Sequence, residues 1–121
     1  MEYLISLALT LILVYTPVSA DGINQKWIEE NYSKREVMIL MRDGARLYTV
    51  VYEPKDHTVK HPIIFCRTPY SCQPYGPDRF SSSLWNSMKF FALHHYIIVY
   101  QDVRGTYRSE GIYENIRPFI P

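Results

Sequence analysis

Two short apolar runs constrain the fold of this chain more than any other feature of its sequence. Residues 62–66 read PIIFC and residues 96–100 read YIIVY. Nearly every side chain in each run is apolar, which is typical of a strand buried on both faces of a sheet. Between the runs, serines that can cap a helix precede apolar residues with helical spacing, at positions 84, 85, 88, 91 and 92. We therefore expect two parallel strands joined by a right-handed helical crossover that ends near His94 or His95.

An antiparallel hairpin is expected upstream of this unit. Residues 36–41 (EVMILM) and 46–52 (RLYTVVY) have the composition of strands, and Arg42-Asp43-Gly44 lies between them. Asp-Gly is a strong turn signal, and two strands joined by a tight turn must be antiparallel. Residues 21–33 form a polar lead-in with one or two helical turns. The prediction is an α/β fold that is incomplete, because two parallel strands need further βα units to cover both faces of their sheet.

The N-terminal residues have the pattern of a signal peptide. Residues 4–14 (LISLALTLILV) form an apolar run of eleven residues. A membrane-spanning helix needs about 20 apolar residues, whereas the core of a signal peptide is shorter. Small residues end this stretch at Val18-Ser19-Ala20, so we expect residues 1–20 to be removed and the chain to be exported to the periplasm or the exterior. No Lys or Arg precedes the run, so an uncleaved segment that attaches the chain to the membrane is the alternative.

Charge, cysteines and histidines exclude several classes of function. The formal net charge of +1 gives no reason to expect a nucleic-acid partner. Cys66 and Cys72 are either two unpaired thiols or, in an oxidising compartment, a short local bridge. None of the histidines has the thiol or carboxylate neighbours of a metal site, so we expect no metal ligand among His57, His61, His94 and His95.

The loop that follows the first apolar strand contains the candidate catalytic residue, Tyr70. It comes directly after Pro69, whose ring restricts the backbone. A phenol O–H stays protonated near neutral pH and is a suitable donor to an oxygen on which negative charge develops. On position alone, a tyrosine that only packs in a core is the alternative.

Three blocks, MRDGARLYTVVYEP, PIIFCRTPYS and YIIVYQDVRGTYRSEG, occur in this order. Together they resemble the opening of the Xaa-Pro dipeptidyl-peptidase-like (CocE/NonD-type) α/β-hydrolases, which include cocaine-esterase-type esterases and α-amino-acid ester hydrolases and acylases. The resemblance runs from residue 37 to residue 118. It implies that residues 21–121 are a partial N-terminal segment of an α/β-hydrolase domain. It also implies hydrolysis of an ester or amide through a serine acyl-enzyme, with no cofactor or metal.

The resemblance assigns one role by position. Tyr70 matches the family tyrosine whose hydroxyl helps to form the oxyanion hole, so we expect Tyr70 to be catalytic. We interpret Asp102, Arg104 and Glu110, in the third block, as charges that shape a loop.

The sequence departs from the family pattern in one respect. The family's Gly-x-Ser-x-Gly elbow, acid and histidine follow later in the chain, and this sequence contains no Gly-x-Ser-x-Gly. No nucleophile, base or acid is therefore assigned, and we expect residues 21–121 alone to be inactive and not to fold stably. The expected partner is a small-molecule ester or amide or a short peptide, and the sequence does not indicate an oligomeric state. The alternative function is a small secreted module that binds a ligand without catalysis.

Overall fold

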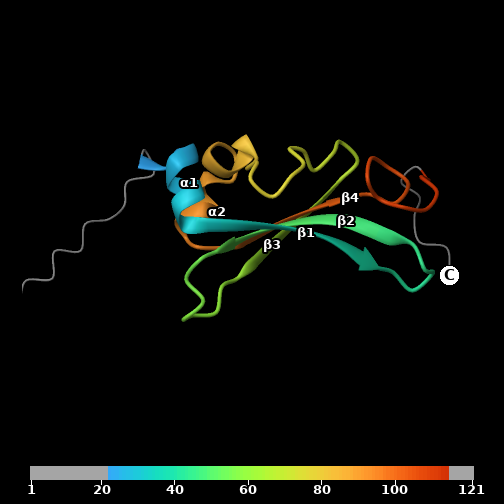
Figure 1. Ribbon diagram of the computed structural model, residues 1–121, viewed down its shortest axis with the longest axis horizontal. Coiled ribbons are helices and arrows are strands. Elements are labelled where there is room, and N and C mark those ends of the chain that lie inside the picture. The colour runs from blue at the N-terminus through green and yellow to red at the C-terminus, as the bar shows by residue number, and fades with distance from the viewer. Residues whose placement is uncertain (1–21, 115–121) are drawn as a thin grey trace, which may run out of the picture.

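The computed structural model describes residues 22–114, which form a four-stranded mixed sheet with short helices (Figure 1). In chain order the elements are α1 (Gln25–Asn31), β1 (Tyr32–Leu40), β2 (Arg46–Pro54), β3 (Ile63–Thr68), the 3₁₀ helix η2 (Ser82–Trp85), α2 (Lys89–Leu93) and β4 (Ile97–Asp102). The order of strands in the sheet is β1-β2-β4-β3. The α/β class is confirmed. The expected signal peptide, residues 1–20, lies outside the described residues.

The strand pairing follows the sequence prediction. β1 and β2 form the antiparallel hairpin, and Gly44 in its turn has φ +87°, a conformation that favours glycine. β3 and β4 pair in parallel, from Ile63 opposite Ile97 to Thr68 opposite Asp102. β2 joins the two units because it pairs antiparallel with β4. The predicted hairpin and the predicted parallel pair therefore belong to one sheet.

The first strand begins earlier than the sequence indicates. We expected it to start at Glu36, but β1 begins at Tyr32 and pairs with β2 along its whole length. The ladder that β2 offers outweighs the low strand propensity of these polar residues, as tertiary context often does. Tyr32 is buried, and its hydroxyl donates to the carbonyl oxygens of Ala92 and Tyr96, each 3.0 Å away. The start of β1 is thereby joined to the end of α2.

The prediction of one continuous helix after Ser81 is wrong. The structure has the single turn η2 and then the five-residue α2. Asn86 separates them, because its backbone leaves the helical region at φ −117° and ψ −100°. Its side-chain Nδ2 donates to the carbonyl of Ser82 at 2.9 Å. Serine and asparagine side chains compete for backbone partners in this way and so interrupt helices.

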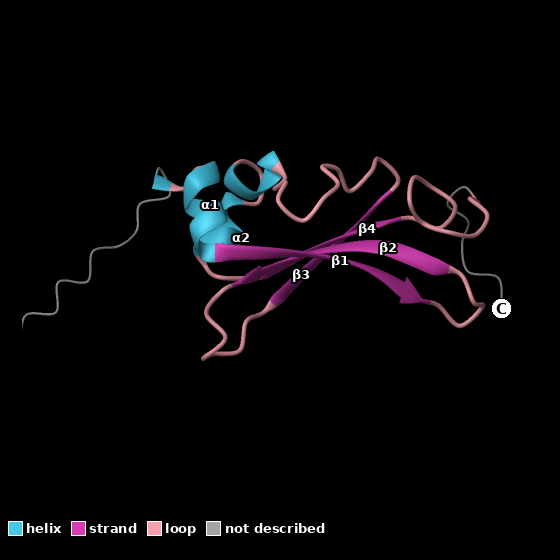
Figure 2. Cartoon of the chain, viewed as in Figure 1, coloured by secondary structure: helices cyan, strands magenta, loops and turns pink. Residues whose placement is uncertain are grey.

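The described helices all lie on one side of the sheet (Figure 2). Ile28, Leu84 and Ala92 supply their buried side chains to the core. β3 is an edge strand, and Ile63 and Phe65 are 64% and 48% exposed. The expectation that β3 is buried on both faces is therefore wrong for residues 22–114, since the elements described there leave alternate side chains of β3 uncovered. No helix in this range is both long and apolar enough to cross a membrane.

Candidate functional site

Two loops leave the sheet side by side, at the carboxyl ends of the parallel strands β3 and β4. They comprise residues 69–81 and 103–111. The strand pairing extends into the loops, since the amide of Val103 donates to the carbonyl of Thr68 at 3.1 Å. Ligands of open α/β sheets bind outside the carboxyl ends of the strands, and Tyr70 lies at this edge, two residues after β3 ends.

Tyr70 combines a fixed backbone with an uncovered side chain. Its amide donates to Oγ1 of Thr68 at 3.0 Å, and Ser71 after it adopts φ +82°, which is rare for a residue other than glycine. The residue as a whole is 83% exposed to solvent. Among residues 22–114, the hydroxyl of Tyr70 has no hydrogen-bond partner. Tyr70 is thus not a packing residue of the described core, and its hydroxyl is available as a donor.

The side chain of Asp102 is hydrogen-bonded to both loops. This carboxylate, at the end of β4, is fully buried. Its Oδ1 accepts from the amide of Cys72 at 2.8 Å, and its Oδ2 accepts from the amide of Arg108 at 3.3 Å. The Oγ of Ser109 donates to the backbone carbonyl of Asp102 at 2.6 Å. Asp102 therefore fixes the backbone two residues after Tyr70.

Arg67 belongs to the same block as Tyr70 but serves the sheet. Its Nε donates to Oε1 of Gln101 at 2.9 Å, and Nε2 of Gln101 donates to Oγ1 of Thr49 at 2.8 Å. Gln101 and Thr49 are buried, so this chain of side chains satisfies polar groups across three adjacent strands. These contacts give Arg67 a structural role.

Two ion pairs connect the loop after β4 to the β1–β2 hairpin. Nη1 of Arg104 lies 2.5 Å from Oδ2 of Asp43. Nη2 of Arg46 lies 2.7 Å from Oε1 of Glu110, while Oε2 of Glu110 accepts from the amide of Arg46 at 2.9 Å. The Arg46 guanidinium lowers the pKa of the Glu110 carboxyl below its ordinary value. Together with the hydrogen bonds of Asp102, these contacts confirm the loop-shaping role expected of Asp102, Arg104 and Glu110.

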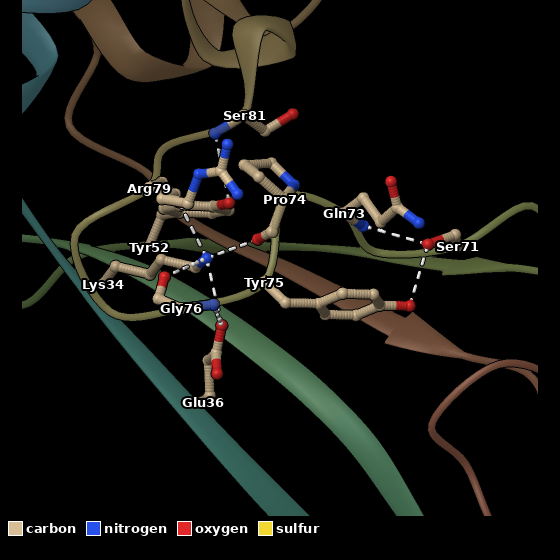
Figure 3. Close-up of polar contacts among 10 residues, drawn as sticks. All are labelled: Lys34, Glu36, Tyr52, Ser71, Gln73, Pro74, Tyr75, Gly76, Arg79 and Ser81. Carbon is tan, nitrogen blue, oxygen red and sulfur yellow. Dashed lines mark hydrogen bonds and ion pairs between the residues drawn. The ribbon is translucent and has the colours of Figure 1, made fainter.

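A buried lysine holds the far half of the loop that carries Tyr70, which the sequence analysis missed (Figure 3). Nζ of Lys34 donates to three backbone carbonyls in the loop 74–79, and Glu36 lies beside it. The sequence does contain a signal for the pair of Lys34 and Glu36, because residues two apart in a strand point to the same face of the sheet. Lys34 and Glu36 are thus two charges on one face of a strand that runs into the apolar residues 37–41. The loop that they hold is 40 to 45 residues away in the sequence.

The same loop is held through the ring of Tyr75. The guanidinium of Arg108 lies over this ring, 3.7 Å from its centroid. The hydroxyl of Tyr75 and the Oγ of Ser71 are hydrogen-bonded at 3.0 Å. Arg108 and Tyr75 were not singled out from the sequence either. Their contact joins the loop after β4 to the residue that directly follows Tyr70.

Neither cysteine forms a disulfide in the described structure. Cys66 is half-buried in β3, Cys72 is buried in the following loop, and both are free thiols, as in the first of the two sequence alternatives. Burial raises the pKa of the Cys72 thiol, and the neighbouring Asp102 carboxylate raises it further. Within residues 22–114, no group of three or more His, Cys, Asp or Glu side chains is placed to hold a metal ion.

The strand order and the loops at the carboxyl edge define this chain as part of an α/β-hydrolase. Residues 43–118 match the X-Pro dipeptidyl-peptidase (S15 family). The chain belongs to this family, which confirms the resemblance seen in the three sequence blocks. The cocaine esterase of Rhodococcus sp. (strain MB1 Bresler) is 35% identical over 89 residues, or 69% of this chain.

Solved structures show the same relationship. An aminopeptidase from the marine sediment archaeon Thaumarchaeota archaeon is 42% identical, with a TM-score of 0.59, and the match covers 70% of this chain and 14% of that one. An α-amino acid ester hydrolase is 35% identical, with a TM-score of 0.56, over 84% of this chain and 17% of that one. The chain also spans only 14% of the length of the cocaine esterase. These relatives are hydrolases, so the alternative of a non-catalytic binding module is not favoured.

Proposed function

We propose that this chain is the N-terminal part of an exported serine hydrolase that cleaves ester or amide bonds, and that Tyr70 is catalytic in it. The observation that carries the proposal is the state of Tyr70: its backbone is fixed at the carboxyl edge of the sheet while its hydroxyl is left without a partner in residues 22–114. The substrate is a small-molecule ester or amide, or a short peptide.

The proposed chemistry proceeds through an acyl-enzyme. The serine of the Gly-x-Ser-x-Gly elbow, which the family order places after the residues of this chain, attacks the substrate carbonyl carbon with its oxygen. The carbonyl π electrons move onto the carbonyl oxygen. The tetrahedral intermediate then expels the alcohol or amine, which takes up the proton that the serine gave to the base. Water hydrolyses the acyl-serine ester in the same two stages. In both, the Tyr70 hydroxyl donates to the oxyanion, a contact that strengthens as negative charge develops.

The coding sequence beyond Pro121 provides the first test. If the family order applies, an open frame follows and encodes a Gly-x-Ser-x-Gly elbow and then the acid and the histidine. A frame that closes directly after Pro121, with no related sequence beyond it, would contradict the proposal.

The second test replaces Tyr70 by phenylalanine in the full-length protein. The ring stays and the donor is removed, so we expect kcat on a p-nitrophenyl ester to fall by about 10²–10³-fold, the usual effect of losing one oxyanion-hole donor. Tyr96→Phe is the matched control, because Tyr96 lies at the amino end of β4, away from the loops at the carboxyl ends, and its ring packs against Phe91. A Tyr70→Phe variant with unchanged kcat would show that Tyr70 is not catalytic.

Export is tested separately from catalysis. The short apolar run and Val18-Ser19-Ala20 predict cleavage after Ala20. N-terminal sequencing of the exported protein should therefore begin at Asp21. Recovery of a chain that still begins at Met1, in the membrane fraction, would favour the uncleaved alternative.

A further inference from the structure

We propose that Lys34, on β1, is a positioning residue for Tyr70: it fixes the loop 69–81 so that the backbone from which the phenol starts is held in one place. The inference rests on the proposed catalytic role of Tyr70. Lys34 would not touch the substrate. It would act through the backbone of the loop and through Tyr75 and Ser71.

Every donor of the Lys34 ammonium is used within the loop. The side chain of Lys34 is fully buried. Its Nζ donates to the carbonyl oxygens of Pro74, Gly76 and Arg79, at 2.6, 2.7 and 2.8 Å (Figure 3). An ammonium group has three N–H donors, so these carbonyls satisfy it completely. Three backbone positions of one irregular loop are thereby fixed to a single point on a strand.

Glu36 lies beside this contact and carries the opposite charge. Its Oε1 lies 3.1 Å from Nζ of Lys34 and also accepts from the amide of Gly76 at 2.7 Å. Burial lowers the pKa of the Lys34 ammonium, whereas the Glu36 carboxylate acts in the opposite direction. Both backbone polar groups of Gly76 are thus bound by the pair, which leaves this turn of the loop little freedom to move.

The constraint reaches Tyr70 through three hydrogen bonds. Tyr75 lies between two of the carbonyls that Lys34 binds, and its hydroxyl is bonded to the Oγ of Ser71 at 3.0 Å. The same Oγ accepts from the amide of Gln73 at 3.2 Å. Ser71 directly follows Tyr70, whose own amide is held by Thr68 on the other side. Since the Tyr70 hydroxyl has no partner of its own in residues 22–114, these backbone contacts are what fixes the point from which its side chain starts.

The main test is Lys34→Met in the full-length protein. Methionine is unbranched and apolar, so it occupies a similar volume but leaves the three carbonyls without their donor. A displacement of about 1 Å in a catalytic group costs on the order of 10² in rate, so we expect kcat on a p-nitrophenyl ester to fall by roughly 10- to 100-fold with little change in KM. Lys55→Met is the matched control, because Nζ of Lys55 also donates to a carbonyl, that of Glu29, but away from this loop. Its kcat should be unchanged.

A double-mutant cycle separates positioning from general damage to the fold. In the Tyr70→Phe background no donor is left to misplace, so Lys34→Met should reduce kcat no further. Glu36→Gln provides a second, milder variant if Lys34→Met does not fold, since glutamine keeps an acceptor for the Gly76 amide and removes only the charge beside Lys34. We expect a smaller loss of kcat with the same dependence on Tyr70.

Each outcome of the cycle decides one question. Equal losses with and without the Tyr70 hydroxyl would show a merely structural role and overturn the inference. So would full kcat in Lys34→Met while Tyr70→Phe is impaired. A Tyr70→Phe variant with unchanged kcat would instead refute the proposed function. That result comes from the single variant, so it is distinguishable from a failure of the inference about Lys34.

Discussion

Replacing Asp102 by asparagine removes the charge that joins the loops after β3 and β4 while keeping the size and shape of the side chain. The carboxylate is fully buried and accepts from two backbone amides, one with each oxygen: Cys72 at 2.8 Å and Arg108 at 3.3 Å. Asparagine has one carbonyl oxygen and one NH₂ group. Whichever amide the oxygen keeps, the NH₂ group faces the other amide, and donor meets donor.

The size of the effect follows from this count. The shorter contact should retain the oxygen, so Cys72 keeps a neutral hydrogen bond and Arg108 loses its acceptor. Loss of one hydrogen bond to a charged group costs about 1.5–3 kcal/mol. At about 1.4 kcal/mol per factor of ten, local opening of the loops becomes roughly 10- to 150-fold more frequent.

Amide hydrogen exchange in the full-length protein measures this opening directly. We expect the Cys72 and Arg108 amides to exchange roughly 10- to 150-fold faster in Asp102→Asn. Asp56→Asn is the matched control, because Asp56 is exposed in the loop before β3 and accepts from the amide of Thr58 at 2.9 Å, away from both loops. In that variant both amides should exchange at the original rate.

Unchanged exchange of both amides in Asp102→Asn would refute the reasoning. It would mean that the two loops are held in place by other contacts. Faster exchange spread evenly over β1 and β2 would refute it as well, since it would indicate a general loss of stability in place of a local one.

Two further predictions concern the fold itself. Expressed alone, residues 21–121 should show no cooperative thermal transition by circular dichroism and no esterase activity, because Ile63 and Phe65 on the open edge of β3 remain exposed; a soluble monomer that melts cooperatively would contradict this. Burial raises the pKa of the Tyr32 hydroxyl above its ordinary value of about 10, so the unfolded chain loses this proton first, and the free energy of unfolding begins to fall near pH 10 and keeps falling until the folded pKa is reached. The melting temperature of the full-length protein should therefore decline more steeply between pH 9 and 11 than that of Tyr32→Phe, and parallel declines would contradict this.

The sequence predicts those parts of the fold that depend on local pattern. The Asp43-Gly44 turn fixes the hairpin, and the apolar runs locate β3 and β4 to within a residue or two. It fails where a residue's partners are remote. The start of β1 at Tyr32 depends on pairing with Pro54, and polar side chains gave no strand signal there. The predicted helix failed because Asn86 bonds to Ser82, a local competition that apolar spacing does not reveal.

The residues of the candidate site show the same difference between local pattern and remote partners. Tyr70 can be found because it lies in a recognisable block, directly after a strand that the apolar pattern locates. Lys34 cannot be found in that manner, since its role is defined by three backbone carbonyls 40 to 45 residues away. Backbone carbonyls are present at every residue and carry no sequence signal. Only the folded loop shows which of them converge on one ammonium.

The distribution of buried charge around Tyr70 favours a functional interpretation of the loop. Lys34 and Asp102 are buried side chains that bond to the backbone of the loop that carries Tyr70: Lys34 with all three of its donors, and Asp102 with one of its two oxygens. Burying a charge is costly, and apolar packing alone could close a surface loop. What these contacts add is a fixed position of the backbone, because hydrogen bonds have a narrow range of distance and angle. If the loop had only to cover the core, there would be no reason to fix four of its backbone positions after an exposed tyrosine with buried charges. A hydroxyl donor that must meet a developing charge within a fraction of an ångström gives such a reason.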